Sequence, residues 1–338
     1  MKQPKLLNSR NIAILAALAI AIALPLFLRN NQYVLFLATT VLLYAVLASA
    51  WNIIGGMAGQ LDLGAAAYVG LGAFTTGTLL IRFDLTPWVG MFIGALLAMG
   101  VATLIGIPLF GFKVKEVWYA LSSSALVEVF RATFMMWNKV GGPTERYLPF
   151  SAEGPRSWYL MRFNTYVPYF YIMLALLVIV FIINQRIRYS KLGYSLLALG
   201  EDEDAVEVLG VDSRLCKLKA LMIYSFVAGL VGGVYGCIYG YLHPSFFSTD
   251  MSLEVVILGI VGGMGVTYGP LLAAIFLVSF REYLRASLSG MFPGKGLEGL
   301  YLMVYALILI VVALFQPRGI APLIKRGFLK LKSFVGVK

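Results

Sequence analysis

Long apolar runs separated by short polar connections dominate the whole chain. The runs cover residues 11–28, 33–51, 64–81, 88–112, 117–137, 166–184, 218–241, 253–261, 268–280 and 297–315. A helix needs about 20 predominantly apolar residues to cross the hydrocarbon core of a bilayer. Most runs approach this length, whereas 253–261 and 268–280 fall short of it. The pattern predicts an all-α integral membrane protein: a polytopic helical bundle of about ten transmembrane segments, including short or broken helices.

The composition supports a membrane location and argues against several other classes of protein. Of the 338 residues, 60% are hydrophobic and only 13% are charged, about half the charged fraction of a soluble domain. The net charge of +11 is explained by basic cytoplasmic loops, so no nucleic-acid partner is expected. Two cysteines and one histidine exclude a disulfide framework and a multi-histidine metal site.

The distribution of lysine and arginine predicts the orientation. Basic residues before the first run place the N-terminus in the cytoplasm, and alternation then puts Lys113 and a loop at about 185–219 on the same side, where positive charge is retained. A basic tail at about 317–338 is also cytoplasmic if 253–261 and 268–280 are two separate segments. We therefore expect one domain over residues 1–338, with both termini on the cytoplasmic side of the membrane.

An acidic segment stands out within the loop at 185–219. Carboxylates come first and apolar residues later between two glycines, an order that suits a short helix with acidic groups at its positive N-terminus. Asp202 or Asp204 is expected to cap this helix, and Ala205, Val208 and Leu209 are expected to share one face. The segment is a candidate docking element for another protein; the alternative is a solvated charged loop. Its residues are Gly200, Glu201, Asp202, Glu203, Asp204, Ala205, Val208, Leu209 and Gly210.

Glycines and two ionisable residues, Asp62 and Glu128, mark a candidate solute pathway. Non-helical backbone at membrane depth is tolerated only where protein buries it or where it lines a water-filled cavity, so "GGMGVTYGP" is either a pathway element or a tight turn between two helices. Glu128 lies within an apolar run and is either functional or paired with Arg131, whereas Glu254 is expected at the outer boundary of its segment. The candidate pathway residues are Gly59, Gln60, Asp62, Gly64, Glu128, Gly262, Gly263 and Gly265.

Three stretches together resemble a known family. They are "LGEDEDAVEVLGVDSRLCKLKALMIYSFVAGLVGGVYG", "GGMAGQLDLGAAAYVGLGAFTTGTLL" and "MSLEVVILGIVGGMGVTYGPLLAA". They are similar to the coupling loop, the glycine-rich third helix and the late hairpin of LivM-type permease subunits of bacterial ABC importers for branched-chain amino acids. Two positions depart from the family: Asp62 replaces a small polar residue, and Gly200 replaces a basic one.

The resemblance implies the function and the partners. It implies import of hydrophobic, branched-chain amino acids by a complex with a second related permease, two cytoplasmic ATPase subunits and an extracytoplasmic substrate-binding protein. The acidic helix would then be the coupling helix that seats in the ATPase. The alternatives are a permease for urea or short amides and an ion-coupled secondary transporter. No GxxxxGK[ST] phosphate loop occurs, so ATP and Mg²⁺ are expected in the partner subunits, and neither a cofactor nor enzymatic activity is expected in this chain.

Overall fold

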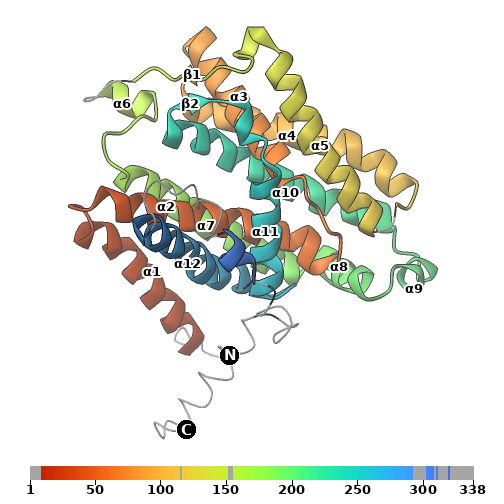
Figure 1. Cartoon of the computed structure of the whole chain (residues 1–338). Helices are drawn as coiled ribbons and strands as arrows, with labels where there is room; N and C mark the ends of the chain where they lie inside the picture. The colour runs from red at the N-terminus through yellow and green to blue at the C-terminus, as the bar shows by residue number, and fades with distance from the viewer. Residues whose placement is uncertain are drawn as a thin grey trace, which may run out of the picture.

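The computed structural model describes residues 9–114, 116–150, 155–291, 302–307, 310 and 319. Long helices account for most of this part of the chain (Figure 1). The predicted tail at 317–338, apart from Gly319, lies outside the described residues, as does most of the predicted segment at 297–315. The α-helices are α1 (Ser9–Phe27), α2 (Gln32–Trp51), α3 (Ala65–Phe83), α4 (Pro87–Gly111), α5 (Glu116–Met136), α6 (Pro155–Tyr159), α7 (Val167–Arg188), α8 (Lys191–Glu201), α9 (Glu203–Val208), α10 (Ser213–Tyr239), α11 (Thr249–Gly262) and α12 (Gly269–Met291).

The apolar runs fold into helices at the predicted places. Six helical stretches among the described residues are long and apolar enough to cross a membrane. They are Gln32–Met57, Ala65–Phe83, Pro87–Gly111, Val167–Arg188, Ser213–Tyr239 and Pro244–Gly262. The first continues α2 through one turn of π-helix, Asn52–Met57, which the periodicity does not predict. The chain is therefore a mostly helical, multi-pass membrane protein.

Helices α3, α4 and α10 form the most closely packed part of the bundle. Glycines let their backbones touch: a Cβ on Gly72 would collide with the carbonyl of Gly229, and a Cβ on Gly229 would lie 2.7 Å from the Cα atom of Ala95. Small residues permit this close approach, which replaces hydrophobic burial as the source of helix association in lipid. Gly72 on α3 and Gly229 on α10 therefore serve close helix packing.

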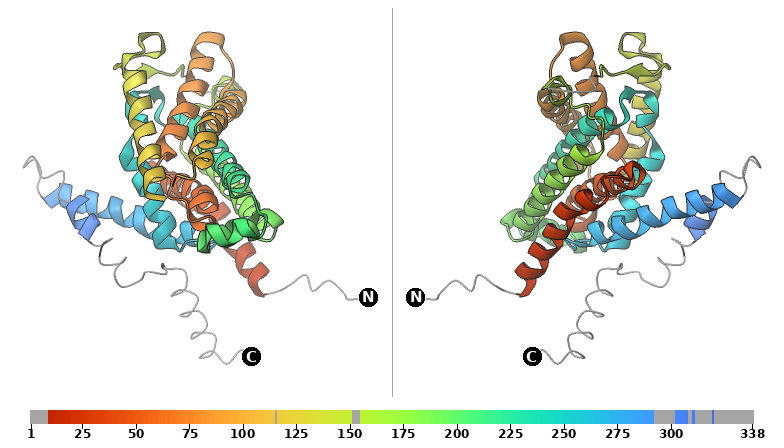
Figure 2. Two further views of the ribbon diagram at one scale, coloured as in Figure 1. Left: turned by 90° about the vertical axis from the view of Figure 1, so that its right-hand side faces the viewer. Right: turned by 90° about the vertical axis from the view of Figure 1, so that its left-hand side faces the viewer.

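A second group of helices packs around α2. Helices α7 and α12 lie on either side of it, and α11 joins this group to α3 (Figures 1 and 2). Part of α12 extends sideways from the rest of the bundle (Figure 2). Asn184 on α7 donates a hydrogen bond of 2.9 Å to the carbonyl oxygen of Ser49 on α2.

The two ends of the bundle carry different structures. Helix α10 is 27 residues long, about 40 Å at 1.5 Å per residue, and connects them. At its start α8 and α9 project from the bundle, and we call this the α9 end (Figure 1). Directly after the last residue of α10, β2 (Tyr241–Leu242) pairs antiparallel with β1 (Arg146–Tyr147), with Arg146 opposite Leu242. We call this the sheet end.

Candidate functional site

The acidic segment contains the ends of two helices. The predicted short helix between Gly200 and Gly210 is present as α9, Glu203–Val208, while Gly200 and Glu201 complete the preceding helix α8. Asp202 separates them in an extended conformation. Its carboxylate accepts a 3.0 Å hydrogen bond from the backbone N–H of Ala205, so Asp202 is the cap of α9.

Several carboxylates fix α9 to the rest of the protein. Glu203 forms a 2.7 Å ion pair with Lys217 of α10, whose side chain is only 8% exposed. Glu207 forms a 2.5 Å ion pair with Lys113 after α4 and accepts a hydrogen bond from Ser213. The hydrogen bond from Lys113 lowers the pKa of Glu207. This part of the acidic cluster therefore orients α9.

The opposite face of α9 is apolar and open to solvent. Val208 and Leu209 are 87% and 82% exposed, and Ala205 is exposed beside them. Val206, in contrast, is buried against the protein. Exposed apolar groups at the tip of a firmly held projection are typical of a surface that another protein covers. Glu201, Asp202, Asp204 and Gly210 surround them and are also exposed.

The base of α8 touches the irregular segment that follows the π-helix. A Cβ on Gly200 would lie 2.8 Å from the carbonyl oxygen of Met57 and 3.4 Å from the nitrogen of Gly59. Gly59 has a φ of +68°, a left-handed conformation that glycine adopts without steric cost. The two backbones can meet here because both residues lack a side chain, which gives the unusual Gly200 a structural reason.

The turn between α11 and α12 meets the same region. Asn52, in the π-helix, accepts a 2.9 Å hydrogen bond from the N–H of Gly265 and donates one of 3.3 Å to the carbonyl of Val266. Arg188, at the end of α7, donates to the carbonyl of Gly265. The glycine-rich segment after the π-helix and the glycine-rich turn between α11 and α12, which we call the two breaks, therefore meet beside the end of α8. The predicted hairpin is present, with Gly262 and Gly263 at the end of α11.

Asp62 is held in a buried hydrogen-bond network. It is 0% exposed, and its carboxylate accepts hydrogen bonds from Tyr119 of α5, at 2.8 Å, and from the N–H of Gly64, at 2.7 Å. The indole of Trp51 donates to its backbone carbonyl at 2.9 Å. Gln60 is also buried. The structure thus brings Gly59, Gln60, Asp62 and Gly64 together in one buried connection between α2 and α3.

Glu128 lies apart from this cluster. It forms a 2.8 Å ion pair with Arg131 and accepts a 2.9 Å hydrogen bond from Thr249, at the start of α11. Its side chain is 49% exposed. The Glu128 to Arg131 pair considered in the sequence is therefore present.

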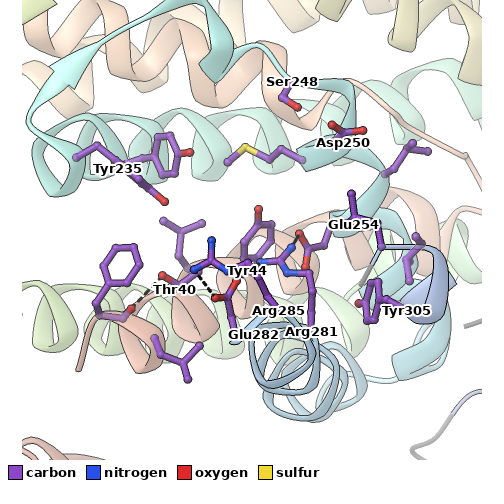
Figure 3. Close-up of a pocket in the computed structure, with 18 of the residues that line it drawn as sticks. Thr40, Tyr44, Tyr235, Ser248, Asp250, Glu254, Arg281, Glu282, Arg285 and Tyr305 are labelled. Atoms are coloured by element: carbon purple, nitrogen blue, oxygen red, sulfur yellow. Dashed lines mark hydrogen bonds and ion pairs between the residues drawn. The ribbon is translucent and has the colours of Figure 1, made fainter. Parts of the chain in front are cut away.

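A set of charged residues that the sequence analysis missed lines a cavity of about 800 Å³ between α2, α10, α11 and α12 (Figure 3). Glu254, which we expected at a membrane boundary, is 8% exposed and paired with Arg281. Three ionisable residues, Arg281, Glu282 and Arg285, lie close together in α12. Their spacing in an otherwise apolar segment was the available signal, but the predicted segment ended at residue 280.

Comparison with known proteins identifies the transport class. Residues 33–313 match the family described as the permease component of branched-chain amino acid transport systems. The chain belongs to this family. It is similar to the high-affinity branched-chain amino acid transport system permease protein LivM of Escherichia coli (strain K12) and to that of Salmonella typhimurium (strain LT2), with 26% identity in each case over 96% of this chain and 77% of the relative. No solved structure matches the chain.

The permease is a transport subunit of a branched-chain amino acid ABC system, not an enzyme. This confirms the resemblance found in the three sequence stretches and the first of the three transport functions considered. A permease of this class implies ATPase and binding-protein partners. The remaining question is how the observed geometry serves them.

Proposed function

We propose that α8 and α9 form the coupling element that receives the ATPase subunits of a bacterial inner-membrane importer. In this arrangement the α9 end and both termini face the cytoplasm, two ATPase subunits hold ATP and Mg²⁺, and a second related permease completes the membrane part. The observation that carries the proposal is the exposed apolar tip, Val208 and Leu209, on a helix held by the ion pairs of Glu203 and Glu207.

The base of α8 offers a direct route for transmitting ATPase motion. Gly200 touches the break after the π-helix, and Arg188 binds the turn between α11 and α12. A displacement of α8 and α9 therefore acts on the first break through a backbone contact, and on the second break through Arg188 at the adjoining end of α7. Allosteric motion needs such an element with alternative arrangements.

In this proposal the buried connection between α2 and α3 around Asp62 moves when the solute pathway opens or closes. Its carboxylate is occupied by Tyr119 and Gly64, so we assign it the positioning of Gly59, Gln60 and Gly64 rather than contact with solute. Gly262, Gly263 and Gly265 serve the corresponding role in the second break. Glu128, half-exposed at the start of the α11 contact, remains a candidate pathway residue.

In this proposal residues 1–338 form one permease domain with about ten transmembrane segments. Helices α1, α5 and α12 and the segment at 297–315 supply those beyond the six long apolar spans. The lipid bilayer surrounds the glycine-packed core, and a binding protein delivers the amino acid at the sheet end.

The test replaces Val208 and Leu209 with arginine, separately and together. Both side chains are exposed, so membrane insertion and thermal stability of the permease should not change, while co-purification of the ATPase subunits and ATP-driven leucine uptake should be lost. Leu215→Arg is the control, because Leu215 is 51% exposed on α10 outside α8 and α9. Retention of the ATPase subunits by the double variant would refute the assignment.

A further inference from the structure

The cavity between α2, α10, α11 and α12 lies toward the sheet end. Its volume of about 800 Å³ falls within the range of about 300–1,000 Å³ that is typical of small-molecule sites. It is bordered by the first half of α2, the end of α10, the start of α11 and the far half of α12.

One wall carries a chain of alternating charges (Figure 3). Arg281 pairs with Glu254 and reaches Glu282 at 3.5 Å, and Arg285 pairs with Glu282 at 2.9 Å. The side chains of Glu254, Arg281 and Glu282 are 10%, 18% and 14% exposed. Arg285 is 48% exposed, which leaves part of its guanidinium free to meet a ligand.

Stability alone is a poor explanation for these charges. Removing two ions from water costs about as much as their attraction returns, and a well-packed apolar pair is often as stable. In a membrane protein, buried ionisable groups usually face a water-filled cavity and mark a solute route. The network at Arg281 fits this second description because it borders an open volume.

The other surfaces of the cavity complete a dipolar environment. Asp250 and Ser248 lie across the cavity from Arg281 and Arg285 (Figure 3). Tyr305 is 7% exposed, and its hydroxyl has no hydrogen-bond partner within the described part of the chain. Apolar side chains from α2 and α11 form part of the remaining surface: Phe36, Leu37, Leu43, Met251 and Ile257.

We propose that this cavity binds a free amino acid with an apolar side chain, with Arg285 meeting the α-carboxylate, Asp250 meeting the α-ammonium group and the apolar surface receiving the side chain. Arg281, Glu254 and Glu282 position Arg285. The inference rests on the transport function proposed above and adds a site within this chain where the solute pauses at the outer side.

A small zwitterion suits the cavity better than a helix of the second permease. An apolar transmembrane helix would cover Asp250 and Arg285 without supplying opposite charges, which carries a large desolvation cost. A zwitterion supplies one charge for each, and guanidinium to carboxylate contacts are among the stronger hydrogen bonds in proteins.

The test measures L-leucine binding to the permease pair and ATPase subunits purified together without the binding protein. Asp250→Asn and Arg285→Gln should each weaken binding by about 10- to 100-fold, the effect of losing one hydrogen bond to a charged group. Arg29→Gln is the matched control, because Arg29 is exposed between α1 and α2 and does not line the cavity. Leucinol, which lacks the carboxylate, and 4-methylpentanoate, which lacks the ammonium group, should compete poorly with leucine.

Three results would overturn the site. The first is leucine binding that is unchanged in both cavity variants, and the second is equal competition by leucinol or 4-methylpentanoate. The third is a disulfide cross-link between Leu302→Cys in the cavity and a cysteine on the second permease that forms equally well in saturating leucine, because a helix of the second permease would then occupy the cavity. Failure of the coupling proposal looks different: arginine at Val208 and Leu209 would leave uptake intact, whereas leucine binding would still depend on Asp250 and Arg285.

The exchanged pair Glu254→Arg with Arg281→Glu separates positioning from mere stability. It should restore the thermal unfolding midpoint lost in either single variant, because opposite charges again face each other. Leucine binding should stay weak, because the reversed network no longer orients Arg285. Full recovery of binding would contradict a positioning role for Arg281.

Discussion

The contact between Gly200 and the segment Met57–Gly59 makes a sharp prediction about a single added methyl group. In Gly200→Ala, the new Cβ would lie 2.8 Å from the carbonyl oxygen of Met57 and 3.4 Å from the carbonyl carbon of Ala58. These are backbone atoms, so relief requires α8 or the segment to move. Overpacking of this kind costs about 1–3 kcal/mol.

The matched control is Gly100→Ala in α4, where a Cβ would meet nothing within 4 Å. Both changes replace a helical glycine and share a gain of about 0.5–1 kcal/mol in helix propensity. Their difference in free energy of unfolding therefore isolates the strain, and we expect Gly200→Ala to be the less stable variant by about 1–3 kcal/mol.

Two assays follow the consequence. Denaturant unfolding of the permease in detergent, followed by tryptophan fluorescence, gives the stability difference. Leucine uptake per ATP hydrolysed, in liposomes containing the whole importer, gives the coupling, which should fall in Gly200→Ala and stay normal in Gly100→Ala. Equal stability and equal coupling in the two variants would refute the reasoning that this backbone contact is close and transmits motion.

Four further predictions concern the same end of the bundle and its surroundings. Glu203→Gln leaves the buried Lys217 unpaired and should destabilise the docking of α9 by about 1–3 kcal/mol, measured by hydrogen exchange of α9; normal protection would contradict the role of the pair. Because the pKa of Glu207 is lowered in the folded protein, its stabilising contribution is complete above the ordinary glutamate pKa and disappears as pH falls through the lowered value. Protection of α9 from exchange, corrected for the intrinsic exchange rate at each pH, should therefore fall in acid, and Glu207→Gln should abolish the part of that dependence due to this group. Asn52→Ala removes both hydrogen bonds to the turn at Gly265 and Val266 and should lower the unfolding free energy by about 1–3 kcal/mol, whereas Glu128→Gln, at a half-exposed ion pair, should change it by less than about 1 kcal/mol.

The positions of the long helices could be predicted because the bilayer imposes a simple rule of length and polarity on each of them. Helix α2 was expected at 33–51 and forms at Gln32–Trp51. The short helix in the acidic segment was also predicted, but the choice between Asp202 and Asp204 as its cap was not, because both residues suit that position. The ion pairs of α9 with Lys113 and Lys217 could not be predicted, because the pattern within the segment does not identify their partners.

Contacts between segments that lie far apart in the chain could not be predicted from the sequence either. Asn52 looked like one polar residue among many, and its partner Gly265 lies more than 200 residues away. Glu254 looked like a boundary residue because it stands at the start of the apolar run 253–261, and its partner Arg281 directly follows another run that ends at residue 280. Hydrophobic periodicity indicates which face of a helix is buried, but not which other helix packs against that face.

The glycine contacts among α3, α4 and α10 restrict how this protein can change shape. Where backbone meets backbone, as at Gly72 and Gly229, there are no side chains whose rotation lets one helix slide past another. We therefore expect these three helices to move as one unit. Alternating access in this half of the importer should then change their contacts with the group of helices around α2 rather than their contacts with one another.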